Sequence, residues 1–388
     1  MDDRAHTSTQ SFRETPPESK TAGRDLRIDI CRGIALWWIF LDHIPNNIGS
    51  SLTPRNYGFS DAAEIFMFLS GVTCALAYGR ARQREGWSGM IGRSLRRGWD
   101  IYSAFLLLTL ACVVLVYLAG SDDLADASNT RILLDNPGAT LAHAAILQYR
   151  PVNTDVLPVF VIFHVLFAPL LWLLLRAPNA VLGASLLLYA IAHIFGWTVA
   201  AWPSGVWFFN PLAWQLLIVL GAWCVIEGWK FRPWLTSSPL LVLAALYLLF
   251  SLALAQGWSI GPLVPQNPVF PLDKSNLSPI RLLHFVALAI VVLRFIPQNW
   301  GALSNPALSC ARWCGENSLP IYCLGVLLAL ASHLTLLDVS EGLAMQVAVS
   351  LAGVLMLIVV ARLLNAISVK RERQSAWAQS IERVPPVR

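Results

Sequence analysis

Long apolar segments separated by short polar turns run along the chain from about residue 28 to residue 364. A membrane-spanning helix needs about 20 mostly apolar residues, and the sequence offers about ten windows of this length. The pattern therefore predicts an all-α, polytopic integral membrane helical bundle. The predicted spans cover residues 28–45, 61–79, 99–119, 155–175, 179–197, 211–229, 239–256, 279–296, 317–335 and 343–364.

The composition agrees with this pattern. Of the 388 residues, 56% are hydrophobic and only 13% are charged, and the mean hydropathy is +0.57. The 16 tryptophans suit the aromatic belts at membrane interfaces. The net charge of +5 sits in the predicted loops, so it indicates topology and not nucleic-acid binding.

The strongest orientation signal is the predicted loop 80–97, which holds six arginines against the single acid Glu85. The positive-inside rule places this loop in the cytoplasm. Alternation of the spans then places both chain termini in the cytoplasm and the turn 45–60 outside. The segment 137–150 is too short to cross the membrane, so it is expected to be interfacial or re-entrant.

The expected organisation is a disordered cytoplasmic tail (1–23), a transmembrane domain (24–367) and a second cytoplasmic tail (368–388). The polar N-terminus lacks the features of a signal peptide, so the first span should be retained. The scattered cysteines are expected to pack as small apolar residues. Cys310 and Cys314 are the only close pair, and no second pair supports a metal site.

The first span carries charges that are costly in lipid, about 2.5–3.5 kcal/mol each at a helix centre. Arg32 and His43 are eleven residues apart, so they differ by only about 20° in azimuth and by about 16 Å along the axis. Asp29, one turn before Arg32, joins the same face. The alternative is a snorkelling arginine and a satisfied buried histidine.

Asp42 and His43 lie at nearly the same depth, and the second span begins with Asp61 and Glu64. A histidine beside carboxylates is a typical general base. The alternative for the two acids of the second span is favourable placement at a helix N-terminus.

Other polar residues also fall at the outer side and are expected to line a polar pocket or, alternatively, to be solvated ends and interface anchors. They are Arg150, Asp155, Trp214, Gln215, Lys274, Ser278, Arg281 and His284. Three further histidines, His164, His193 and His333, are expected to be packing or interfacial residues.

At the cytoplasmic side, Arg93 and Arg96 are spaced i, i+3 and could form one phosphate clamp. The alternative is topology alone. A phosphate site inside, a polar track and a polar pocket outside together suggest a reaction across the bilayer.

Several motifs resemble those of the membrane acyltransferase-3 superfamily, and the amino-acid sequence of the first two spans is most similar to its OpgC branch. The motifs are R-x-D-x-x-R-G with a later histidine (Arg27, Asp29, Arg32, Gly33, His43), FMFLSG (66–71), Arg93-x-x-Arg96 and GENSLPIYCL (315–324). Two positions depart from the superfamily pattern: Leu319 stands where a tyrosine is frequent, and Gly325 where a histidine is frequent.

The resemblance implies an O-acyltransferase in the bacterial inner membrane that moves an acyl group from cytoplasmic acyl-CoA to sugar hydroxyls of a periplasmic glucan, with succinyl as the expected group. Acyl-CoA would be a substrate, with no permanent cofactor and no metal. The implied catalytic residues are His43 and Arg32. From their position alone, Asp42, Asp61 and Glu64 are expected to orient His43 or to contact the glycan. Arg93, Arg96, Arg27 and Asp29 would serve the donor, and Asp61 with the outer polar group the glycan.

Two other functions fit the same residues less well. A transporter or exporter of an anionic metabolite or glycan would also carry intramembrane charges, but the chain shows no convincing internal repeat. A non-catalytic membrane scaffold would leave the alignment of Asp29, Arg32 and His43 unexplained.

Overall fold

The computed structural model describes residues 25–257 and 272–382, and this part of the chain is built from helices. The predicted disordered tail lies outside the described residues. The α-helices are α1 (Leu26–Asp42), α2 (Ala62–Ala119), α3 (Asp122–Ala127), α4 (Arg131–Asp135), α5 (Pro137–Ala145), α6 (Val156–Arg176), α7 (Pro178–Ile194), α8 (Pro211–Ile226), α9 (Arg232–Leu235), α10 (Ser238–Ala255), α11 (Pro279–Phe295), α12 (Pro306–Glu316), α13 (Ser318–Asp338) and α14 (Leu343–Glu382). Short 3-10 helices are η1 (Ile48–Leu52), η2 (Pro54–Asn56), η3 (Gly228–Phe231) and η5 (Gly301–Ser304).

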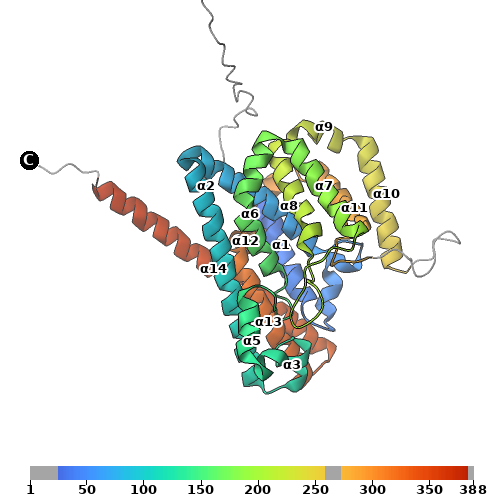
Figure 1. Ribbon diagram of the computed structural model, residues 1–388, viewed down its shortest axis with the longest axis vertical. Coiled ribbons are helices and arrows are strands. Elements are labelled where there is room, and N and C mark those ends of the chain that lie inside the picture. Colours follow the sequence, from blue (N-terminus) through green and yellow to red (C-terminus); the bar gives the residue numbers. More distant parts are fainter. Residues whose placement is uncertain (1–24, 258–271, 383–388) are drawn as a thin grey trace, which may run out of the picture.

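The second and third predicted spans belong to one element, α2, and the expected loop 80–97 between them is helical. The helix is broken only at Gly86, whose backbone has φ 73° and ψ −164°. Glycine adopts positive φ at little cost, so a single residue turns the chain between two helical halves (Figure 1). The prediction of a loop was wrong because charge clusters report the side of the membrane and not backbone conformation.

Among the described residues, five helices are long and apolar enough to cross a membrane, or six if the bent pair of α8 with η3 and α9 counts as one span. The five are α2, α6, α10, α13 and α14 up to Lys370. α1, α7 and α11 have 17 residues each, slightly less than the usual spanning length. The chain is therefore a helical membrane protein, while ten spans and cytoplasmic termini stay predictions.

Helix α1 lies at the centre of the bundle, where it contacts α12, α13 and α2 (Figure 1). α2 in turn packs on α6 and α8, and α7 packs on α8. One large core cluster joins these helices, with fully buried Phe40, Met67, Phe105 and Trp214 among its members. The two motif-bearing helices α1 and α2 are thus held from several sides.

The segment 120–150 forms a group of short helices at one end of the bundle (Figure 1). α5 has only nine residues, so it is too short to cross a bilayer, as expected for 137–150. α14 begins beside α13 and continues to Glu382, past the predicted end of the last span, and its far half projects from the bundle.

Gly33, which follows the motif arginine on α1, is required by the close approach of α12. A β-carbon at Gly33 would lie 1.8 Å from the carbonyl oxygen of Ala311, and one at Gly315 would lie 1.8 Å from the carbonyl oxygen of Asp29. The two helices therefore touch through their backbones. Gly71 of the FMFLSG motif meets the carbonyl oxygen of Ile218 on α8 in the same way, at 2.1 Å.

We expect Gly33→Ala to destabilise the protein by roughly 1–3 kcal/mol, because the added methyl group forces α1 and α12 apart. The measurement is thermal unfolding of the purified protein in detergent. Gly79→Ala is the matched control, since a β-carbon at Gly79 meets nothing within 4 Å. Equal unfolding temperatures for the two variants would contradict this account of the α1–α12 contact.

Candidate functional site

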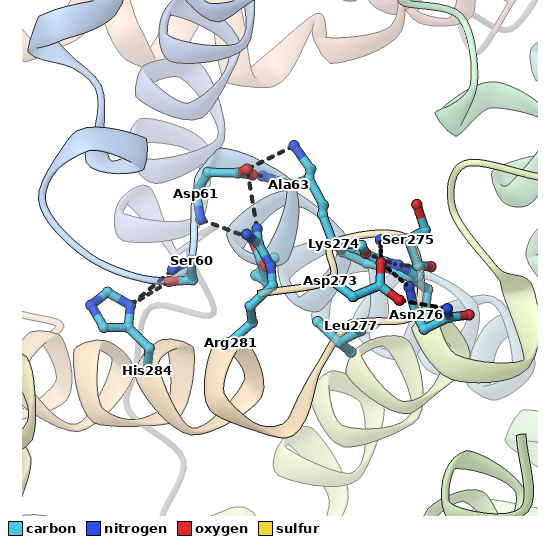
Figure 2. Close-up of polar contacts among 12 residues, drawn as sticks. Ser60, Asp61, Ala63, Asp273, Lys274, Ser275, Asn276, Leu277, Arg281 and His284 are labelled. Atoms are coloured by element: carbon cyan, nitrogen blue, oxygen red, sulfur yellow. Dashed lines mark hydrogen bonds and ion pairs between the residues drawn. The ribbon is translucent and has the colours of Figure 1, made fainter. Parts of the chain in front are cut away.

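An ionic cluster is formed by Asp61, Glu64, Lys274 and Arg281. Figure 2 shows Lys274 and Arg281 approaching Asp61; Lys274 is half-buried and the other three residues are buried. Asp61 is the N-cap of α2: its side chain accepts from the Ala63 N–H, and the Glu64 side chain accepts from the Asp61 N–H at 2.9 Å. This capping box satisfies free N–H groups of the helix start. The interpretation of the two acids as helix N-terminal residues is therefore confirmed.

Two cations from elsewhere in the chain converge on these acids. Arg281, in the first turn of α11, contacts Glu64 at 2.6 Å and Asp61 at 3.1 Å, and the Lys274 ammonium lies 2.7 Å from Asp61. Burial alone would raise the pKa of Asp61, which precedes the membrane-spanning helix, but Lys274 and Arg281 outweigh it and hold that pKa below its usual range. Two positive charges and two negative charges thus compensate one another.

Neighbouring polar residues join α11 and the segment 272–278 to the bundle. His284 Nδ1 lies 2.7 Å from Ser60 Oγ, and the Trp214 indole N–H donates to the carbonyls of Lys274 and Ser275, each at 3.1 Å. Other predicted substrate contacts are also engaged within the protein. Gln215 bonds to Ser185, and Arg150 pairs with Asp155 at 3.1 Å.

The charges of α1 are distributed along its length. Arg27, near the start, pairs with Asp25 and donates to the Ile296 carbonyl at 3.0 Å. Asp29 is buried. Arg32 is half-buried, donates to the hydroxyl of Ser318 on α13, and lies over the Phe66 ring at 5.5 Å from its centroid.

His43 immediately follows α1 and is half-buried. Its Nδ1 is buried and has no hydrogen-bond partner among the described residues. The predicted orienting carboxylates are bound elsewhere: Asp42 accepts from the Thr53 hydroxyl at 2.7 Å, and Glu64 belongs to the ionic cluster. Asp42 and Glu64 do not orient His43 because they bond to Thr53 and Arg281 instead. The positions of these two partners depend on the tertiary fold.

Arg32 on α1 and His43 just after it line different cavities. A cavity of about 240 Å³, here called the arginine cavity, is lined by Arg32, Phe66, Ser70, Thr73, Cys74, Ala77, Tyr78, Arg97, Ile101, Val156, Leu157, Phe160, His164, Ser318, Leu319 and Tyr322. His43 lines a second cavity of about 40 Å³, here called the histidine cavity, together with Ser128, Asn153, His333 and mostly apolar neighbours. The histidine cavity has room for a few water molecules or a hydroxyl group, but not for a sugar ring.

A hydrogen bond connects the walls of the two cavities. Tyr322, which lines the arginine cavity, donates its hydroxyl to the Asn153 carbonyl at 2.6 Å. Asn153 lines the histidine cavity, and its side chain donates to the His43 carbonyl at 3.3 Å. Tyr322 and Asn153 thus form a partition between the two cavities.

The predicted phosphate clamp lies on the surface of α2, beyond Gly86. Arg93 and Arg96 are both exposed, and Arg93 forms an ion pair with Glu85 across the helix break. An incoming phosphate would therefore compete with Glu85 for Arg93.

Reasoning from the sequence missed several cavity residues. Arg97 was counted only as a topology signal, and Cys74, His164 and His333 were expected to pack. One signal was present: small and polar residues recur at 70, 73, 74, 77 and 78 of α2, which is the spacing of one helix face. Within the described residues, no group of three His, Cys, Asp or Glu side chains could hold a metal ion.

Comparison with known proteins supports the resemblance of the chain to the OpgC family. No curated protein and no solved structure matches the chain. A family model described as OpgC protein matches residues 24–369, which include α1, α2, both cavities and the ionic cluster. The chain therefore belongs to the OpgC protein family.

Proposed function

We propose that this protein is an inner-membrane O-acyltransferase, which moves a succinyl group from cytoplasmic acyl-CoA to sugar hydroxyls of a periplasmic glucan. The observation that carries the proposal is the pair of cavities along α1 and at its C-terminal end in a member of the OpgC family. One cavity is lined by Arg32 and the other by His43. This arrangement suits a donor and an acceptor that approach from different sides.

At the acceptor side, His43 would act as the general base. Its Nδ1 has no partner within the described part of the chain, so a ring nitrogen is free to take the proton of a sugar hydroxyl. The hydroxyl oxygen then bonds to the thioester carbonyl carbon, the carbon–sulfur bond breaks, and the CoA thiolate leaves. The alternative of a transient acyl-histidine uses the same residue.

At the donor side, Arg32 lies about 16 Å from His43 along α1, from the eleven-residue separation. If the thioester carbon reacts beside His43, its tetrahedral intermediate is too far from Arg32 for direct contact. Arg32 therefore serves the donor chain, and the oxyanion would need another hydrogen-bond donor. The exposed Arg93 and Arg96 would bind phosphate groups of CoA outside the arginine cavity.

The double variant Arg93→Ala, Arg96→Ala should raise the KM for acyl-CoA roughly tenfold, because two charge-assisted contacts to phosphate are lost at an exposed site. Glu85→Gln is the matched opposite change: it frees Arg93 and should lower the KM slightly. The measurement is acyl transfer by purified protein across donor concentrations. An unchanged donor affinity in the double variant would remove these arginines from the donor site.

The proposed function is tested by mass spectrometry of periplasmic glucans from cells with and without the gene. A mass difference of one succinyl group per modified sugar is expected only when the gene is present. Identical glucans in both strains would contradict the proposal. Uptake of glucan or metabolite into liposomes without acyl-CoA would instead favour a transporter.

A further inference from the structure

Arg97 stands out among the residues of the arginine cavity. It is half-buried, whereas Arg93 and Arg96 on the same helix are exposed. It lines the cavity together with Arg32, and it forms no ion pair or hydrogen bond with the rest of the described chain. A guanidinium group between helices is costly unless a counter-charge is nearby.

The walls of the cavity supply no such charge. Two arginines and no aspartate or glutamate are found among the described residues that line it. Its histidine is also satisfied: His164 Nδ1 bonds to the Phe160 carbonyl at 2.9 Å, and its Nε2 lies 3.6 Å from the Cys74 sulfur. The cavity therefore suits an occupant that brings its own negative charge.

The cavity is long, and Arg97 lies at one end of it. In the half of α2 before the break at Gly86, the lining residues run from Phe66 to Tyr78, which corresponds to about 18 Å of helix. Tyr78 and Arg97 flank the break at Gly86, so they mark one end. Val156, Leu157 and Tyr322, next to the partition with Asn153, mark the other.

The size and lining favour a chain over a ring system. The volume of about 240 Å³ is below the usual range of about 300–1,000 Å³ for sites that enclose drug-sized ligands. The walls mix apolar side chains such as Ile101 and Phe160 with the hydroxyls of Ser70, Thr73 and Ser318. Such a wall suits a flexible chain of methylene and amide groups.

From these observations we propose that Arg97 binds the diphosphate of the acyl-CoA donor at the mouth of the arginine cavity, with the pantetheine arm lying in the cavity and its thioester pointing toward Tyr322. This inference rests on the proposed function. The pantetheine arm then spans the cavity from Arg97, at the diphosphate, to the partition formed by Tyr322 and Asn153. Arg97 is thus a donor-positioning residue, additional to the exposed Arg93 and Arg96.

The test compares four donors: succinyl and butyryl groups, each attached to CoA and to N-acetylcysteamine, which has the thioester but no phosphate. Arg97→Gln should lower kcat/KM roughly 10- to 100-fold for both CoA donors, as expected for a lost charge-assisted contact. It should leave both N-acetylcysteamine donors within about twofold of the wild type, which also shows that the variant is folded. Arg97→Lys should recover part of the loss, and Arg84→Gln, an exposed arginine of the same helix, is the matched control.

Two results would overturn the inference. A loss confined to both succinyl donors would mean that Arg97 binds the acyl carboxylate, and no change with any donor would mean that it binds neither group.

Binding of free CoA without acceptor, measured by its effect on thermal unfolding, separates this inference from the proposed function. Weaker protection of Arg97→Gln by CoA supports the site even if the wild type transfers no acyl group, whereas equal protection contradicts it.

Discussion

The His43→Ala variant is expected to lose at least about 100-fold of its glucan acylation, while it inserts and folds as the wild type does. A positioned general base typically contributes about 10²–10⁴-fold, and a sugar hydroxyl is a weak nucleophile without one. Folding should survive because the ring of His43 is half-buried and its Nδ1 makes no hydrogen bond to described residues. The measurement is glucan acylation by mass spectrometry, normalised to the amount of protein in the membrane.

His193→Ala is the matched control for this experiment. His193 lies on α7, bonds through Nδ1 to the Tyr189 carbonyl at 2.9 Å, and lines neither of the two cavities. It should acylate glucan at the wild-type level. Near-normal acylation by a well-expressed His43→Ala protein would show that another group takes the proton.

Arg281→Met is expected to destabilise the protein by about 3–5 kcal/mol, because it leaves the buried carboxylates of Asp61 and Glu64 without their shared guanidinium. Both carboxylates are almost fully buried, so water cannot replace the lost contacts. Thermal or chemical unfolding in detergent measures the effect. The segment 272–278 should also become more accessible to protease.

Two further variants separate charge compensation from packing. Lys274→Met should cost less, because the Lys274 side chain is 31% exposed and contacts only Asp61 of the two acids. Adding Glu64→Gln to Arg281→Met should restore part of the stability, since one unpaired charge is removed. If the double variant is as unstable as the sum of the two single changes, the coupling between Glu64 and Arg281 is absent.

Much of the fold follows from local patterns, but the connections between elements do not. Apolar windows located the helices well, including α6 and α13. The arginine-rich segment was misread as a loop, because its composition says where charge is tolerated and not how the backbone turns. The turn is made at Gly86. A glycine within a helical segment does not by itself indicate whether the helix continues or turns there.

The candidate site was predictable only within single helices. Their spacing predicted a shared helix face for Arg32 and His43, but His43 lies just past the end of α1, and the two residues line different cavities. The ionic cluster joins Glu64 to a residue 217 positions away, and the partition joins Asn153 to Tyr322 over 169 positions. Such pairs depend on how helices pack, and a single sequence contains no rule that selects one distant partner over another.

The partition also has a consequence for the energy supply of the cell. In the proposed inner-membrane location, a continuous polar passage through the protein would let protons run down the gradient that drives ATP synthesis. Tyr322 and Asn153, joined by the hydrogen bond from the Tyr322 hydroxyl to the Asn153 carbonyl, stand between the two cavities and keep them separate. Under the proposed function, this separation would let the protein hold Arg32 on α1 and His43 just after it without opening a proton path across the membrane.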